Sequence, residues 1–581
     1  MDKKAIADIL DEMGTLLELQ GANPFKARAY HNASRTVEGL TRDMTELVES
    51  GEIREIEGIG EKIAAVISDL MIRGRSKEHD ELRGSFPPGV PDMLRVQGLG
   101  PKKVKVLYDK LKIKSLAELE AAAKEDRLSV LDGFGEKTQA NILQGIQALR
   151  ARGQKTTYSR ADDAAQVIFK ALVAKKSIIR GEIAGSLRRR KEVIWDIDIV
   201  ISAKESAWPS LMEMFTSHPE VGAIIGKGET KSSVVLNAGI NCDLRIVDDS
   251  EYPFTLNYFT GSKEHNIEMR SRAKKFGWSL NEYGFSELGA EEKRGAAKRV
   301  VKCGDEADIY KALELEYIPP ELRENLGEIE AAEKNQLPTL VEVSDIRGTF
   351  HSHTKYSDGV NTLEEMANAA RKLGWEYLGI ADHSKVAAYA GGLTAQKVRQ
   401  QFKEIDEINA RLKRMRLIKG TECDILPNGD LDWPDSVLAS FEYVVVSVHS
   451  SFKMTEVEMT KRITKALKNK YVTMLGHPSG RLLLNRDPYP VDMVQVINVA
   501  SDYGKMIEIN AHPLRLDLDW RLCKYAREKG VKISINPDAH NIEGLNDVRY
   551  GVGTARKGWL EKKDVLNTQP LNRVLKSLTI H

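Results

Sequence analysis

From residue 341 onward, short apolar runs alternate with helical segments, and each run ends at or near a histidine. The runs read YLGIAD, YVVVSVH, YVTMLGH, MIEINA and KISINPDAH. Strands that alternate with helices are typical of a parallel sheet or barrel, because each parallel strand is reached through a crossover. The active sites of such folds lie at the carboxyl ends of the strands. We therefore expect a barrel over 341–581, with its chemistry at the strand ends.

Six histidines and three carboxylates at these strand ends form a candidate metal site. They are His351, His353, Asp358, His383, Glu422, His449, His477, Asp538 and His540. Nitrogen and oxygen donors without a thiolate favour Mn²⁺, Zn²⁺ or iron, and this set exceeds the needs of one ion. We expect two or three ions, which lower the pKa of a bound water and hold a phosphoryl group on both sides. A structural hydrogen bond explains any one of these histidines better, but it does not explain the whole series.

A second candidate site lies in the segment GSLRRRKEVIWDIDIVI, residues 185–201. Asp196 and Asp198 are two residues apart on a predicted strand, so both carboxylates point to one face and can share divalent cations. Asp243, in NCDLRIV, lies on another apolar strand, where it can complete a two-metal site and accept a proton from an attacking hydroxyl.

The residues upstream of these aspartates fit a triphosphate. Gly185 permits close approach, Ser186 can donate a hydrogen bond, and the basic run 188–191 supplies positive charge. An exposed pair of aspartates on an edge strand is the alternative, and the neighbouring Gly-Ser and basic residues weigh against it.

Residues 1–150 contain one phrase three times, as IEGIGEKIAAVI, VQGLGPKKVKVL and LDGFGEKTQANIL. In each copy Gly-x-Gly precedes a helix start with lysine, where exposed N–H groups can bind a phosphate oxygen without reading sequence. The residues concerned are Gly58, Gly60, Lys62, Gly98, Gly100, Lys102, Gly133, Gly135 and Lys137. A glycine-capped turn explains a single copy equally well, but three copies in series resemble helix-hairpin-helix motifs.

Bulk composition narrows the possible partners. With a net charge of +1 and no broadly basic domain, contacts with nucleic acid must come from local clusters and backbone amides. The sequence has neither a membrane span nor a signal peptide, so we expect a cytoplasmic, nucleoid-associated protein with no membrane partner. Four cysteines, never arranged as CxxC, predict buried thiols rather than disulfides or a zinc ribbon.

Residues 1 to about 317 resemble the family X DNA polymerases, the DNA polymerase beta class. YFTGSKEHNIEMR at 258–270, NPFKARAYHNA at 23–33 and the hairpin repeats carry the resemblance, whereas the Gly-Ser and aspartate motif is shared with other nucleotidyltransferases. The resemblance implies a DNA-directed DNA polymerase with a mixed-sheet palm. Its substrates would be gapped or primed DNA and dNTPs, its cofactor Mg²⁺ or alternatively Mn²⁺, and we expect a monomer.

The same resemblance implies roles for individual residues. Asp196 and Asp198 would hold both Mg²⁺ ions, Asp243 would bind the ion at the primer terminus, and Ser186 and Arg189 would contact the triphosphate. The further nucleotide or template contacts would be Gly185, Tyr258, Phe259, Gly261, Asn266 and Arg270. The two aromatic residues would lie against the sugar and help to exclude ribonucleotides.

The sequence departs from the family at two positions. Val66 stands where members with 5′-deoxyribose-phosphate lyase activity carry a Schiff-base lysine, which argues against that activity. Lys26 and Lys62 still match lysines that bind a 5′-phosphate. Lys263 replaces an acidic residue beside the incoming nucleotide, and we expect it to strengthen nucleotide binding; a solvated surface lysine is the alternative.

The order of the histidine motifs over about 341–576 resembles the polymerase-and-histidinol-phosphatase (PHP) domain. That resemblance implies a distorted (β/α)₇ barrel with a trinuclear site of Mn²⁺ or Zn²⁺. The phrase EINAHP at 508–513 leaves His512 open as a cleft residue or a metal ligand.

The two resemblances in this order match bacterial family X polymerases with a C-terminal PHP domain, which implies gap filling in DNA repair such as base excision repair. The PHP site would act as a 3′–5′ exonuclease, an AP endonuclease or a trimming enzyme for 3′ ends.

The predicted layout is multidomain, with α/β and α+β parts. A helical DNA-binding domain with the first hairpin spans 1–90, a fingers-type hairpin domain spans 91–154, and a palm with a thumb-type subdomain spans 155–317. A charged linker, 318–340, would lead to the PHP domain, 341–581. Two alternatives remain: the PHP domain is a small-molecule phosphatase, or the protein is a DNA-end-binding scaffold with relic sites.

Overall fold

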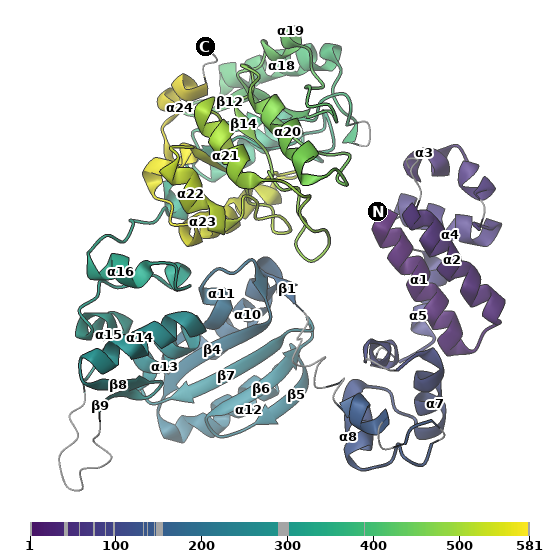
Figure 1. Cartoon of the computed structure of the whole chain (residues 1–581), viewed down its shortest axis with the longest axis vertical. Helices are drawn as coiled ribbons and strands as arrows, with labels where there is room; N and C mark the ends of the chain where they lie inside the picture. The colour runs from purple at the N-terminus through teal and green to yellow at the C-terminus, as the bar shows by residue number, and fades with distance from the viewer. Residues whose placement is uncertain are drawn as a thin grey trace. The chain divides into compact units, whose positions relative to one another are not determined.

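The computed structural model describes residues 3–578 apart from short gaps. The gaps are 40–43, 57, 74–75, 88, 97–98, 132, 136–137, 144–145, 147–154, 289–300 and 388–389. The chain divides into two compact units, Met1–Gly153 and Gln154–His581 (Figure 1). Among the described residues, no helix has both the length and the apolar character that a bilayer crossing requires.

The first unit consists of short helices. They are α1 (Lys3–Gln20), α2 (Pro24–Gly39), α3 (Met44–Glu49), η1 (Glu52–Glu55), α4 (Glu61–Arg73), α5 (Lys77–Gly84), α6 (Gly89–Asp92), η2 (Met93–Arg95), α7 (Pro101–Leu111) and α8 (Leu116–Lys124). Their apolar faces form one core that includes Val66, which is 2% exposed.

The glycine repeats share one local geometry. In each copy the carbonyl of the second glycine accepts a hydrogen bond from the first turn of the next helix, at 2.9 Å for Gly60, 3.1 Å for Gly100 and 3.1 Å for Gly135. Gly58 and Gly133 adopt left-handed backbone angles, with φ of 89° and 84°, which glycine tolerates best. Gly98 and Lys137 lie outside the described residues, whereas the side chains of Lys26, Lys62 and Lys102 are exposed.

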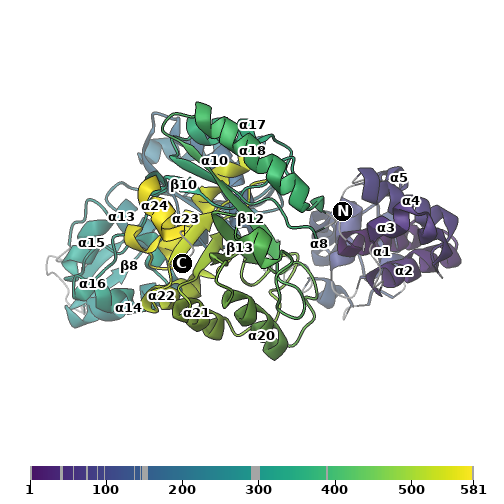
Figure 2. The ribbon, with the colours of Figure 1, turned by 90° about the horizontal axis from the view of Figure 1, so that it is seen from above.

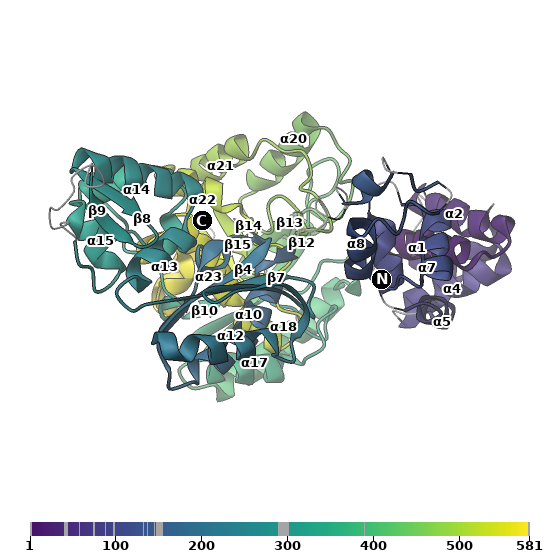
Figure 3. The same cartoon turned by 90° about the horizontal axis from the view of Figure 1, so that it is seen from below.

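The second unit begins with the palm. Its elements are β1 (Thr156–Thr157), α10 (Tyr158–Val173), β2 (Ile178–Ile183), α11 (Gly185–Arg188), β3 (Val193–Ile194), β4 (Asp196–Ala203), η3 (Glu205–Ala207), α12 (Trp208–Thr216), β5 (Val221–Lys227), β6 (Lys231–Leu236) and β7 (Asn241–Val247). The five-stranded sheet has the order β2-β4-β7-β6-β5, and β4 and β7 run parallel side by side (Figure 3). Ile197 and Ile199 on β4 and Leu244 on β7 are fully buried, so the residues between them face the open side of the sheet.

Next come α13 (Tyr252–Thr260), α14 (Lys263–Lys275), the hairpin β8 (Trp278–Asn281) and β9 (Gly284–Glu287), and α15 (Glu306–Ala312). The segment 318–340, predicted as a charged linker, is instead packed and carries η4 (Pro320–Leu322) and α16 (Glu328–Glu333). Its charges have distant partners, because the fully buried Arg323 pairs with Glu306 at 2.7 Å and Glu328 lies 2.8 Å from the His265 ring.

The C-terminal part is a seven-stranded parallel sheet in the order β10 to β16, as predicted. Its strands are β10 (Gly348–Thr349), β11 (Tyr377–Ile380), β12 (Arg416–Asp424), β13 (Tyr443–Ser447), β14 (Met474–Leu475), β15 (Met506–Asn510) and β16 (Ile533–Asn536). Ser352, after β10, bridges in parallel to Ala539, after β16, which brings the two edges of the sheet together. The result is a nearly closed barrel.

Helices connect the strands and cover the outside of the barrel (Figure 2). They are α17 (Leu363–Lys372), α18 (Ala395–Arg411), α19 (Asp435–Leu438), α20 (Glu456–Leu467), α21 (Met493–Asp502), α22 (Trp520–Glu528), α23 (Val548–Lys557) and α24 (Leu571–Leu578), with the short turns η5 (Val343–Asp345), η7 (Glu543–Asp547), η8 (Lys562–Asp564) and η9 (Leu566–Thr568). Strands buried on both faces need such cover, and β13 is buried along its whole length.

Candidate active sites

The parallel pairing of β4 with β7 brings the three predicted palm carboxylates together. Asp198 lies directly opposite Asp243, and Asp196 lies two residues earlier on β4. Burial raises the pKa of Asp198 to about 7, and repulsion from Asp196 and Asp243 adds to the shift. The pKa of Asp196 is also raised, first by burial and then by Asp243. These carboxylates oppose each other's ionisation, and divalent cations bound between them would stabilise their ionised forms.

A cavity of about 330 Å³ opens beside these carboxylates. It is lined by Asp196 and Asp198 and by every residue predicted to contact the nucleotide: Gly185, Ser186, Arg189, Tyr258, Phe259, Gly261, Lys263, Asn266 and Arg270. The Ser186 hydroxyl is buried and makes no hydrogen bond to any described residue. A side chain at Gly185 would place its Cβ 2.4 Å from Asp198 Oδ2, so only glycine fits against the carboxylate. A buried free hydroxyl, a guanidinium and a carboxylate pair around one cavity suit a metal-bound triphosphate.

The basic run 188–191 does not act as a block, which corrects the expectation that all four side chains supply charge to the triphosphate. Three of its members pair elsewhere: Arg188 Nη2 lies 2.6 Å from Glu306 Oε2, Arg190 donates to the Tyr158 hydroxyl, and Lys191 Nζ lies 3.2 Å from Glu324 Oε2. Of the four, Arg189 lines the cavity.

The predicted metal ligands of the barrel converge at the carboxyl ends of its strands. Their donor atoms form three groups, each within 4.8 Å: His353, Asp358, His383 and His540; His351, His353 and Asp538; and His383, Glu422 and His449. His353 and His383 each belong to two groups, so the three form one continuous cluster. Nε2 of His351 and Nδ1 of His353 are buried without a hydrogen bond to any described residue. This donor set fits several divalent cations held close together.

The carboxylates and imidazoles of the cluster shift each other's pKa. Burial lowers the pKa of His353 to about 3, and His540 and His383 add to the effect. Burial alone would raise the pKa of Glu422, but the neighbouring imidazoles of His351 and His449 outweigh it and hold the pKa well below the usual value. Burial would also lower the pKa of His351, His383, His449 and His540, but the neighbouring carboxylates outweigh it and raise these four pKa values. Because a metal coordinates neutral imidazole and ionised carboxylate, metal binding would release protons from these rings.

His477 and His512 lie at the edge of this cluster. His477 Nε2 is 2.8 Å from Glu422 Oε1 and 3.3 Å from His449 Nε2, although His477 belongs to none of the three groups. His512 lines a cavity of about 370 Å³ together with Asp538 and His540. Within the described residues it joins none of the three donor groups.

One curated relative matches this chain along almost its whole length. A DNA polymerase/3′-5′ exonuclease PolX of Bacillus subtilis (strain 168) is 38% identical over 576 residues, which is 99% of either chain. The chain belongs to the family X DNA polymerases. The PHP domain family matches residues 349–512. The DNA polymerase beta thumb family matches 255–324, a helix-hairpin-helix domain matches 1–76, and a SAM-like helix-hairpin-helix tandem matches 90–148.

The barrel also has relatives outside family X. A probable phosphatase of Thermoanaerobacter sp. (strain X514) is 29% identical over 229 residues, which is 38% of this chain and 89% of that protein. A probable phosphatase of Vibrio parahaemolyticus is 28% identical over 250 residues, 41% of this chain and 94% of that protein.

Two buried carboxylates beside the cluster were not predicted from the sequence. Glu508 Oε1 lies 2.7 Å from His351 Nδ1, and Glu508 Oε2 accepts a hydrogen bond from the backbone N–H of His477 at 2.7 Å. The fully buried Asp382 accepts several hydrogen bonds from side chains around His353 and His383. Both carboxylates interrupt apolar runs, and that was the available signal, because a buried acid needs partners.

Arg515 was also missed. Its Nε lies 3.5 Å from Asp538 Oδ2, and its Nη1 is buried without a hydrogen bond to any described residue. A guanidinium donor that is unpaired beside metal ligands suits a phosphate group.

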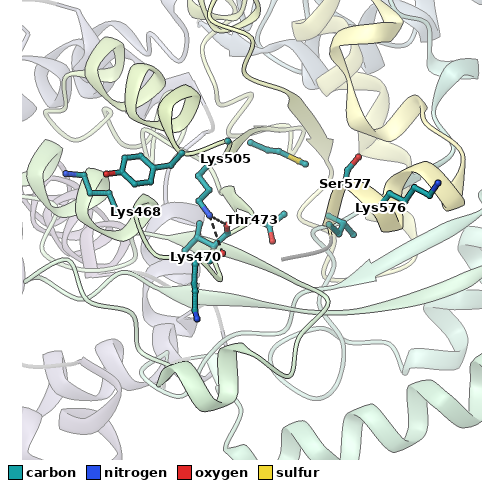
Figure 4. A pocket seen from close by; sticks show the side chains of 11 residues that line it. Lys468, Lys470, Thr473, Lys505, Lys576 and Ser577 are labelled. Atoms are coloured by element: carbon teal, nitrogen blue, oxygen red, sulfur yellow. Dashed lines mark hydrogen bonds between the residues drawn. The ribbon is translucent and has the colours of Figure 1, made fainter. Parts of the chain in front are cut away.

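A further hollow of about 420 Å³ lies at the opposite end of the barrel, where β14 and β15 begin (Figure 4). Four lysines line it: Lys468, Lys470, Lys505 and Lys576. Lys505 Nζ donates to the backbone carbonyl of Val472 at 2.7 Å and so links the segments that lead into β14 and β15. None of the candidate site residues lines this hollow.

Proposed function

We propose that this chain is a gap-filling DNA polymerase whose PHP barrel is a metal-dependent 3′–5′ exonuclease, working on DNA in the cytoplasm. The polymerase half of this proposal rests on one observation. Asp196, Asp198 and Asp243 converge beside a cavity, and all the expected nucleotide contacts line that cavity. The chain is similar over its full length to a relative whose name gives both activities, and this similarity supports a polymerase and an exonuclease in one chain.

In the polymerase site, the chain's own groups would bind and orient the nucleotide. Ser186 Oγ and Arg189 would hold the triphosphate, and Tyr258 and Phe259, which pack edge to face at 5.2 Å, would form the wall beside the sugar. Asp243 would accept the proton of the primer hydroxyl. Divalent cations held by the three aspartates, Mg²⁺ or alternatively Mn²⁺, would neutralise the phosphates.

In the PHP site, Glu508 would fix the ring of His351, and Arg515 would hold a phosphate oxygen of the DNA end. The imidazole-rich cluster favours two or three Mn²⁺ or Zn²⁺ ions over Mg²⁺, which prefers oxygen ligands and water. When bound, these ions would supply an activated water for hydrolysis.

A small-molecule phosphatase is the second candidate for the barrel, because the relatives that match the barrel alone are named probable phosphatases. The two candidates differ in product. Release of mononucleotides from primed DNA supports the exonuclease, and faster release of phosphate from histidinol phosphate supports the phosphatase.

The two activities should be separable by substitution. Asp196→Ala with Asp198→Ala removes ligands for both polymerase cations, so primer extension should fall below detection while mononucleotide release continues at the parental rate. Both activities are measured on the same primed DNA with the same folded preparation. Loss of both activities, or survival of extension, would show that the sites are assigned wrongly.

A further inference from the structure

Lys557, the last residue of the barrel helix α23, points into the polymerase part of the unit. Its side chain is 0% exposed. Its Nζ donates to the backbone carbonyl of Arg189 at 3.0 Å, to that of Glu321 at 3.4 Å and to Glu324 Oε1 at 2.5 Å. All three N–H groups of this ammonium therefore serve residues outside the barrel. An ammonium is costly to bury unless such partners compensate for its lost hydration.

Glu324 is the centre of the charge cluster. Besides Lys557, its carboxylate lies 3.0 Å from Arg189 Nε and 3.2 Å from Lys191 Nζ. Burial would raise the pKa of Glu324, but Lys557 and Arg189 hold it at about 2. Burial lowers the pKa of Lys557 to about 8, and Glu324 opposes the shift, so both groups are ionised at pH 7. Three cations against one carboxylate leave an excess of positive charge next to the nucleotide cavity.

The same contacts fix the backbone that carries the cavity residues. Arg189 follows α11, the helix that presents Gly185 and Ser186, and the Arg189 guanidinium also donates to the carbonyl of Thr260. A second barrel contact holds the same segment, since Trp520 Nε1 donates to Glu192 Oε2 at 3.1 Å. The segment after α11 is therefore anchored on barrel helices α22 and α23.

We infer that Lys557 is a positioning residue for nucleotide binding: by neutralising Glu324 and holding the Arg189 carbonyl, the PHP barrel keeps the Arg189 guanidinium available for the triphosphate. This inference rests on the proposed polymerase function. Without Lys557, Glu324 would draw both remaining cations toward itself, and the cluster would lose half of its net positive charge. The triphosphate would then bind less tightly, although no residue that touches it has changed.

The test compares KM for dNTP with kcat in the full-length protein. Lys557→Met should raise KM roughly 3- to 30-fold with a smaller change in kcat, because a charge-assisted contact is affected without loss of the metal ligands. Lys557→Met combined with Glu324→Gln should bring KM back toward the parental value, since it removes one charge of each sign. A merely structural role for Lys557 predicts no such rescue.

Lys524→Met is the matched control, because Lys524 Nζ lies over the Trp559 ring at 4.3 Å in the same group of barrel helices, and the ion pairs that Glu324 makes with described residues are with Arg189, Lys191 and Lys557. It should leave KM unchanged, and exonuclease activity should persist in every variant. An unchanged KM in Lys557→Met overturns the inference. So does a rise in KM that comes with equal losses of kcat and thermal stability and that Glu324→Gln does not rescue. If Lys557→Met does not fold, Glu324→Gln alone decides: KM should fall, and a rise overturns the inference. A parental protein that cannot extend primers would refute the polymerase function itself.

Discussion

At the scale of single residues, Lys263 occupies a position where charge should matter. It is the first residue of α14, it is exposed, and it lines the cavity that contains Asp196 and Asp198. Lys263→Ala should weaken dNTP binding several-fold, because an exposed charge contact contributes up to about 1 kcal/mol. Titration of dNTP into the complex of each variant with primed DNA measures the dissociation constant of the nucleotide. Lys274→Ala, at the exposed far end of the same helix, is the control; equal affinities in the two variants would leave Lys263 as a solvated surface residue.

Residues differ in how much of their role the sequence reveals. Asp196 and Asp198 could be predicted, because a two-residue spacing on a strand puts both carboxylates on one face. Lys557 could not be predicted, since a lysine in the last turn of a helix is ordinary and its partner Glu324 is distant in sequence. Glu508 is intermediate: its place inside an apolar strand signals a buried carboxylate but does not say which imidazole it orients.

At the scale of elements, the barrel strands end in the cluster of candidate metal ligands. The alternation of strands and helices predicted both the barrel and its ligand-bearing edge, because parallel strands present their carboxyl ends together. The segment 318–340 was not predicted correctly, because its glutamates resemble a solvated linker until His265 is brought against Glu328 and Arg556 against Glu321. Pairing between distant residues is invisible to local composition.

The cluster at the strand ends should act as one metal-dependent unit. Chelation should abolish hydrolysis of DNA 3′ ends, and Mn²⁺ should restore it better than Mg²⁺. His351→Ala or His449→Ala should have the effect of chelation, because loss of one shared ligand weakens neighbouring ions too, while primer extension persists. Mononucleotide release and elemental analysis of the purified protein measure the outcome.

His218→Ala, which alters a palm histidine outside the cluster, is the control. A His351→Ala protein that lacks bound metal and still degrades primed DNA at the parental rate would show that the barrel is not the nuclease.

At the scale of the whole second unit, polymerase and barrel share their apolar cores. Trp559 packs in one core with Leu315 and Leu322, and Tyr550 packs edge to face on Tyr158 at 5.9 Å. A chain that ends at residue 340 would expose these surfaces. We therefore expect its unfolding temperature to be several degrees lower than that of the second unit in the full chain, and we expect it to self-associate. Calorimetry and light scattering test this, and a 1–340 chain as stable and monomeric as the parent would contradict it.

The anchoring of the segment after α11 on barrel helices α22 and α23 also bears on inheritance. A recombination event that exchanged residues 341–581 for another PHP barrel would have to supply a cation at position 557 and an aromatic ring at position 559 to suit Glu324 and Leu315. A barrel selected only for its own hydrolytic chemistry has no reason to carry either. Such hybrids should therefore be selected against, and the two halves should descend together as a matched pair.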